Sequence, residues 1–73
     1  MTKEEFLSNV TGTHEIPVAP RDTMEKIIIQ YSDVPNYEYY AVVNGVLVDV
    51  SGYEWNDFDE FIEATVEEYK KTR

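Results

Sequence analysis

The sequence predicts a small α+β domain, in which a three-stranded antiparallel sheet is packed by an N-terminal and a C-terminal helix. Three observations support this prediction: a capping signal near the start, an Asn-Gly pair between two β-rich runs, and a helical apolar repeat near the end. The expected order is α-β-β-β-α, with both helices on one face of the sheet. No linker divides the chain, so residues 1–73 are expected to form a single domain.

The first helix is predicted from a capping box, in which Thr2 caps the helix and Glu5 reaches back to the cap. Its apolar face consists of Phe6, Leu7 and Val10, and a Thr-Gly pair ends it. A helix this short is not stable alone, so we expect it to dock through Phe6 and Leu7.

Residues 13–23 carry two prolines and are expected to form a connection rather than a regular element. Within them, Glu15–Val18 could pair briefly at a sheet edge, where Pro17 is tolerated. His14 stands there without the cysteine or further histidine that a metal site needs, so an exposed or hydrogen-bonded role is expected.

The segment Met24–Ser32 supports two interpretations. The helical spacing i, i+3, i+4, i+7 is met by Met24, Ile27, Ile28 and Tyr31. Three consecutive isoleucines instead favour a strand, and so does the alternation of Ile27, Ile29 and Tyr31 with Lys26 and Gln30 on the other face. We expect a strand, because turn residues at 33–36 join the segment to another β-rich run.

Asn44-Gly45 predicts a type I′ hairpin turn, because both residues accept a positive φ. This turn sets the register, so that Val43 faces Val46, Ala41 faces Val48 and Tyr39 faces Val50. These residues and Tyr37 are expected on the core face. The opposite face is expected to carry Glu38, Tyr40, Val42, Leu47 and Asp49.

The last helix is predicted to begin after a cap at Asn56 or Asp57, with Trp55 as a hydrophobic staple against its first turn. The expected buried stripe follows the helical period and consists of Phe58, Phe61, Ile62, Thr65, Val66 and Tyr69. Basic residues gather at the C-terminal end, where cations suit the helix dipole: Lys70, Lys71 and Arg73.

The formal net charge is −9. It disfavours approach to nucleic acid or anionic membranes and attracts basic partners. The chain has no cysteine, so neither a disulfide framework nor a thiolate metal site is expected. No apolar run is long enough to span a bilayer, and the N-terminus lacks the apolar stretch of a signal peptide. We therefore expect a cytoplasmic protein without membrane contact.

The acids of the last helix support two interpretations. Negative charge suits the first turn of a helix, so a solvated face explains Asp57, Asp59 and Glu60. Glu63, Glu67 and Glu68 lie farther along, and Glu63 and Glu67 repel each other. These later acids favour a surface for a basic partner, because carboxylates one turn apart have a spacing of the same order as nucleic-acid phosphates.

The outward face of the hairpin is a second candidate surface. Tyr40, Val42 and Leu47 would form an exposed apolar strip if both helices cover the other face, and such a strip marks a contact site. It could serve a homodimer or another partner. Alternatively, Ile27–Tyr31 or Glu15–Val18 folds over it.

Catalysis is not expected. Glu54 and Asp57 could form an acid–base pair, but no nucleophile–base set, glycine-rich phosphate loop or metal cluster accompanies them. We expect neither a cofactor nor a metal ion. Six scattered basic residues against fifteen acids make no basic stripe, so direct binding of nucleic acid is not expected either.

These patterns predict a non-enzymatic acidic binding protein, an inhibitor or nucleic-acid-mimicking decoy of a basic protein that handles nucleic acid. Charge would come from Asp57, Asp59, Glu60, Glu63 and Glu67, and buried contact area from Tyr40, Val42, Leu47 and Trp55. The alternative is a small structural or regulatory homodimer that uses its apolar sheet face.

In its composition the chain resembles small acidic phage-borne inhibitors and immunity proteins, several of which occupy nucleic-acid-binding clefts. This resemblance implies a factor of a phage or mobile element that acts in the host cytoplasm. It covers no motif and assigns no residue roles.

Overall fold

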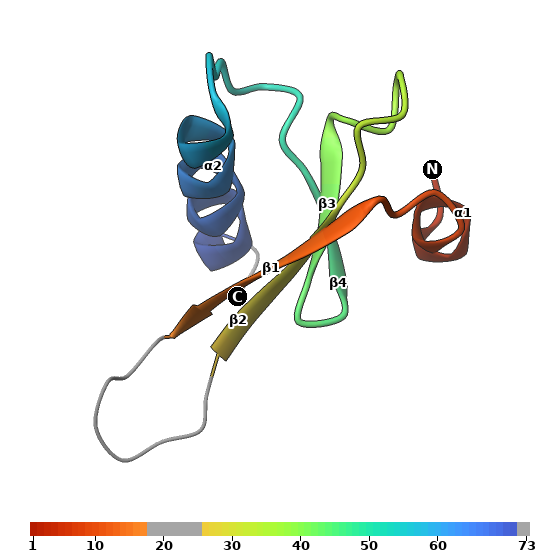
Figure 1. Cartoon of the computed structure of the whole chain (residues 1–73), viewed down its shortest axis with the longest axis horizontal. Helices are drawn as coiled ribbons and strands as arrows, with labels where there is room; N and C mark the ends of the chain where they lie inside the picture. Colours follow the sequence, from red (N-terminus) through yellow and green to blue (C-terminus); the bar gives the residue numbers. More distant parts are fainter. Residues whose placement is uncertain (18–25, 72–73) are drawn as a thin grey trace.

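The computed structural model describes residues 1–17 and 26–71. The elements in chain order are α1 (Lys3–Leu7), β1 (Gly12–Pro17), β2 (Lys26–Tyr31), β3 (Tyr40–Val43), β4 (Val46–Asp49) and α2 (Phe58–Lys71). The strands form one antiparallel sheet in the order β1-β2-β3-β4 (Figure 1). The predicted α+β class with N-terminal and C-terminal helices is confirmed, but the sheet has four strands rather than three.

The additional strand is β1, which lies where a connection was predicted. It pairs with β2 along its whole length, from Gly12 opposite Tyr31 to Pro17 opposite Lys26. Its residues alternate between half-buried and exposed, as in a strand with one covered face. Pro17 is tolerated because it is the last residue of an edge strand, as the expected edge pairing assumed. Val18 lies outside the described residues.

The strand interpretation of residues 26–31 is confirmed, while Met24 and Glu25 lie outside the described residues. The hairpin register is confirmed too, because Val43 pairs with Val46 and Ala41 with Val48. At the turn, φ is 49° at Asn44 and 82° at Gly45. Asn44 also joins the turn to β2, since its Oδ1 accepts a hydrogen bond from the Ile28 N–H at 2.9 Å.

The two helices lie on opposite faces of the sheet (Figure 1), so the prediction that they share a face is wrong. α2 covers the face that carries Ala41, Val43 and Val48, and these residues form one core with Phe61 and Ile62 of the helix. Successive residues of a strand point to opposite faces, so Val42 faces the other side.

On that other side, α1 packs against β3. Phe6 is 0% exposed and Val42 is 1% exposed, which places the phenylalanine over the sheet residue. Lys3 Nζ donates a hydrogen bond to the Gly45 carbonyl at 3.2 Å and so attaches α1 to the hairpin turn. Thr2 caps the helix as predicted, because its Oγ1 accepts a hydrogen bond from the Glu5 N–H. Leu7 is exposed, so docking depends on Phe6 rather than on both residues.

The N-terminus of α2 is capped by Asp57, whose Oδ1 accepts a hydrogen bond from the Glu60 N–H at 2.9 Å. Glu60 Oε1 in turn accepts a hydrogen bond from the Asn56 N–H at 2.8 Å. Trp55 stacks edge-on against Phe61 with ring centroids 5.2 Å apart, as expected of a staple.

The predicted core is right at its centre and wrong at its ends. Phe61, Ile62 and Thr65 of α2 are buried. Three predicted core residues are each 42% exposed: Tyr39, Val46 and Phe58. They lie at the ends of their elements, where less of the facing layer covers them. Within residues 1–17 and 26–71, no helix combines the length and apolar character needed to cross a bilayer.

Candidate functional site

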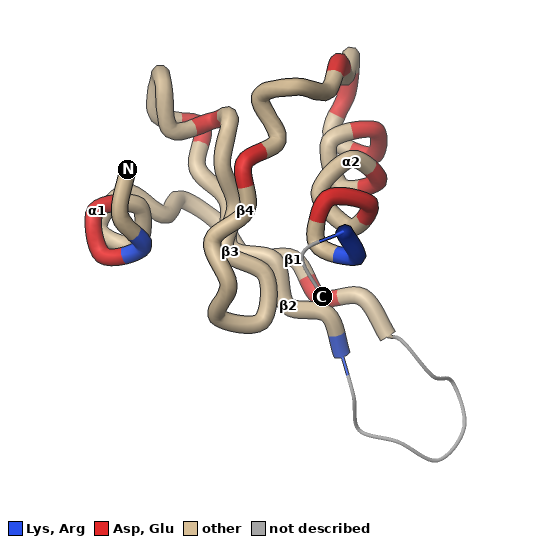
Figure 2. The backbone as a smooth tube through the Cα atoms, turned by 180° about the vertical axis from the view of Figure 1, so that it is seen from behind, with Lys and Arg blue, Asp and Glu red and all other residues tan. Residues whose placement is uncertain are grey.

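The sheet separates the predicted site residues into two groups. The acids from Asp57 to Glu67 and the staple residue Trp55 lie on the side of α2 (Figure 2). Tyr40, Val42 and Leu47 alternate with the residues that α2 covers, so they lie on the side of α1. A single flat surface therefore cannot include both groups.

The predicted apolar strip is largely covered. Val42 is buried, and Tyr40 and Leu47 are half-buried. The cover is α1 rather than the segment Ile27–Tyr31 or Glu15–Val18, because those segments are strands of the same sheet. The prediction that Val42 contacts a partner is therefore wrong for this structure. A homodimer through this face stays a prediction, with less area available than the sequence suggested.

Several acids of the α2 side have structural roles. Asp57 and Glu60 accept the capping hydrogen bonds at the start of the helix. Glu68 Oε2 accepts a hydrogen bond from the Tyr53 hydroxyl at 3.0 Å, and Lys71 Nζ donates to the same hydroxyl oxygen at 2.8 Å. That hydrogen bond raises the pKa of Lys71, and the nearby negative charges of Glu67 and Glu68 raise it further.

The remaining acids of α2 form a row on its outer face. Asp59, Glu63 and Glu67 are exposed and stand four residues apart, which is about 6 Å of helix rise for each step. Within the described part of the chain, no ion pair or side-chain hydrogen bond involves Asp59 or Glu63. We call these three residues the acidic row. Figure 2 shows the acids of α2 turned away from the sheet.

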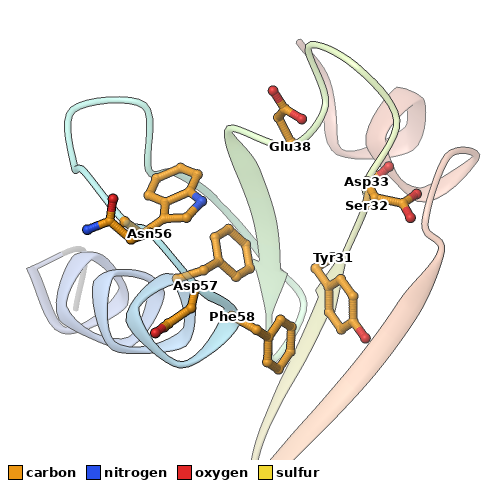
Figure 3. Close-up of a pocket in the computed structure, with 9 residues that line it drawn as sticks. Tyr31, Ser32, Asp33, Glu38, Asn56, Asp57 and Phe58 are labelled. Atoms are coloured by element: carbon orange, nitrogen blue, oxygen red, sulfur yellow. The ribbon is translucent and has the colours of Figure 1, made fainter.

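A groove adjoins the N-terminal end of the acidic row and has a volume of about 540 Å³. Its walls are the residues that follow β2 and the residues that lead into α2 (Figure 3). Aromatic side chains line its floor: Tyr31, Trp55, Phe58 and Phe61. Carboxylates line its rim: Asp33, Glu38 and Asp57. We call this site the aromatic groove.

Contacts between rings hold the floor of the aromatic groove together. The ring centroids of Tyr31 and Phe58 lie 5.1 Å apart, and those of Phe58 and His14 lie 5.5 Å apart, both edge-on. Trp55 and Phe61 make the further edge-on contact across the start of α2. Such pairs contribute about 0.5–1.5 kcal/mol each beyond the area they bury. Phe58 thus has a fixed place although it is partly exposed.

The loop that carries the acidic rim is held by hydrogen bonds. The Asp33 N–H donates to Thr11 Oγ1 at 3.1 Å, and the Val34 N–H donates to Ser32 Oγ at 3.1 Å. The Tyr37 N–H donates to the Val34 carbonyl at 3.0 Å. These bonds leave the carboxylate of Asp33 uncommitted at the rim.

Reasoning from the sequence found Trp55 and Asp57 but missed the other groove residues. Tyr31 was assigned to the core, and Asp33 appeared only as a turn residue. The groove forms because the connection between β2 and β3 meets the segment before α2, and no local pattern predicts that meeting. The signal that was present is a set of aromatic residues next to acids in both segments.

No family model, curated protein or solved structure matches the chain. Within residues 1–17 and 26–71, no three histidine or carboxylate side chains are grouped so that they could hold a metal ion.

Proposed function

We propose that the chain is a non-enzymatic binding protein, which uses the outer face of α2 to occupy the nucleic-acid-binding surface of a basic protein. The observation that supports this proposal best is the acidic row. Asp59 and Glu63 make no ion pair or side-chain hydrogen bond among the described residues, and Glu67 interacts only with the charge of Lys71 at the helix end.

The acidic row lowers the stability of the isolated helix. Like charges four residues apart on a helix repel each other by about 0.2–0.5 kcal/mol per pair. The acids within the first turn are offset by the helix dipole, but Glu63 and Glu67 lie beyond it. A cationic surface would turn this repulsion into attraction on binding.

The spacing of the acidic row suits a groove that binds phosphates. The carboxylates follow each other at about 6 Å along a rigid helix, and phosphates along a nucleic-acid strand are spaced by a distance of the same order. The net charge of −9 would steer a basic partner toward this face. Inhibition would follow because the helix and the nucleic acid compete for one surface.

The test begins with capture of binding proteins from a lysate of the source cell at low salt, with and without excess duplex DNA. The captured protein is then purified, and its association rate is measured over a range of salt concentrations. The proposal expects that nucleic acid competes with the chain, and that the affinity falls steeply as salt increases.

Two variants with the same change in net charge locate the contact. Glu63→Gln with Glu67→Gln removes charge from the acidic row, while Glu4→Gln with Glu5→Gln removes it from α1 on the opposite face. We expect the first pair to slow association by about tenfold at low salt, and the second pair to have a much smaller effect. Equal effects of the two pairs, or binding that nucleic acid does not displace, would contradict the proposal.

A further inference from the structure

We propose that the aromatic groove is a receptor for one arginine side chain of the basic partner. As a contact with that partner the site rests on the proposed function, whereas its affinity for a guanidinium group does not. The inference joins two independent features of the groove, an apolar aromatic floor and a rim of negative charge.

The floor offers aromatic surface to an incoming group. Phe58 is 42% exposed although it belongs to the apolar stripe of α2, and Trp55 is half-buried beside it. The faces of aromatic rings carry partial negative charge, so they attract a cation within about 6 Å of the ring centroid. An exposed phenylalanine held by Tyr31 and His14 is therefore a preformed surface for stacking.

The rim selects a positively charged occupant. Asp33 and Glu38 lie on the side of the connection after β2, and Asp57 lies across from them on the side of α2 (Figure 3). No lysine or arginine is among the described residues that line the groove. Within the described part of the chain, neither the Asp33 nor the Glu38 carboxylate takes part in a hydrogen bond or ion pair. A neutral apolar side chain would fill the floor and leave this charge uncompensated.

Arginine fits these two features together better than lysine does. A guanidinium group is planar, stacks on aromatic faces and directs its N–H donors outward from its edge. It can therefore lie on the floor while its edge reaches the carboxylates of the rim. A lysine ammonium is a strongly hydrated point charge, and it gains less from stacking.

The groove also lies in the right place for such a contact. Phe58 lines the groove, and the acidic row begins at the next residue, Asp59. A basic surface that docks on the outer face of α2 would bring its own arginines to the groove. The row would then supply attraction over a distance, and the groove would supply a buried anchor of the kind that dominates binding energy.

Trp55 makes the inference testable with small probes, because it is the single tryptophan of the chain. Its fluorescence is followed during titration with N-acetyl-arginine amide, with N-acetyl-lysine amide, and with N-acetyl-citrulline amide, which has nearly the shape of arginine without its charge. We expect saturable binding of the arginine probe, binding several times weaker for lysine, and no saturable binding of citrulline.

Two double variants with equal changes in charge show where the probe binds. Asp33→Asn with Glu38→Gln neutralises the rim, and Asp59→Asn with Glu63→Gln neutralises the start of the acidic row. The first pair should weaken the arginine probe by about three- to tenfold, and the second by less than about twofold. Phe58→Leu, which keeps an apolar residue but removes the ring, should weaken it by about two- to fivefold.

The inference is overturned if citrulline binds as well as arginine, if lysine binds more tightly, or if the two charge variants weaken the arginine probe equally. Its failure is distinct from failure of the proposed function. Loss of partner binding through the acidic row alone would leave the proposed function in place and remove the groove as an anchor. Binding of the arginine probe without any partner that nucleic acid displaces would do the reverse.

Discussion

Gly45 holds the turn between β3 and β4 in a conformation that other residues adopt with difficulty. Its φ is 82°, and an added methyl group there would meet no other atom. Gly45→Ala should therefore act through backbone strain alone, and lower the free energy of unfolding by about 1–2 kcal/mol. Gly52→Ala is the matched control, because Gly52 has equal space and no positive φ. Urea unfolding that gives both variants the same stability would refute this explanation of the turn.

Asp49 makes a small contribution to stability that depends on pH. The Ser51 hydroxyl and the Ser51 N–H both hydrogen-bond to its carboxylate and hold its pKa below the ordinary value of 3.8. A carboxyl group whose pKa is lower in the folded state stabilises the fold above its unfolded pKa. This contribution is lost as the pH falls through the lower, folded value.

Asp49→Asn should consequently destabilise the protein at pH 7, by less than about 1 kcal/mol because the group is exposed and screened by solvent. The difference from the unsubstituted chain should shrink as the pH is lowered below about 4. Asp59→Asn serves as the control, since it removes the same charge at a site without a hydrogen-bond partner among the described residues. Urea unfolding at pH 7, 4 and 2.5 measures both.

Helix α1 is the element whose position the sequence predicted least well. Phe6 is its buried residue and covers Val42, whereas Leu7 points to solvent. Phe6→Ala should lower the free energy of unfolding by about 3–5 kcal/mol, which is most of the stability expected for a core of this size. Leu7→Ala, in the same turn, should cost less than about 1 kcal/mol. Equal losses in thermal or urea unfolding would show that α1 docks through both residues.

The prediction from sequence succeeded where one local signal decides the outcome. Asn44-Gly45 set the hairpin register without help from distant residues, and Thr2 and Asp57 marked the helix starts. It failed for β1 because the prolines near that segment were taken as evidence against a strand, although Pro17 only ends it. The side on which α1 packs depends on tertiary packing, and the sequence pattern of a five-residue helix does not contain that information.

The candidate site was predicted in part for the same reason. The acids of α2 follow from helical spacing, and the structure leaves Asp59 and Glu63 without ion pairs among the described residues. The sheet residues were misassigned once α1 took the other face. The aromatic groove joins segments some twenty residues apart, so its residues appear together only in the folded chain.

The whole molecule carries much charge for its size, −9 on a chain with a radius of gyration of 12.0 Å. The Debye length is about 10 Å at 0.1 M salt, so most pairs of its carboxylates interact at low ionic strength. Raising sodium chloride from about 0.02 to 0.5 M should stabilise the fold by roughly 1 kcal/mol, or about 4–8 °C in Tm.

A variant that neutralises the acidic row with Asp59→Asn, Glu63→Gln and Glu67→Gln should have a higher Tm at low salt and a weaker dependence on salt. Thermal unfolding followed by circular dichroism measures both effects. A Tm that falls with salt, or a variant with the same salt dependence as the unsubstituted chain, would show that self-repulsion does not limit stability.

The opposite placement of α1 and α2 affects how the chain is best attached to a surface. A linker at residue 1 leaves from the side of the sheet that α1 covers, so the outer face of α2 and the aromatic groove remain free in solution. A linker placed after α2 would instead hold that helix close to the support. Biosensor measurements with the two orientations should therefore differ for a partner that binds the α2 side, and agree for one that binds the side of α1.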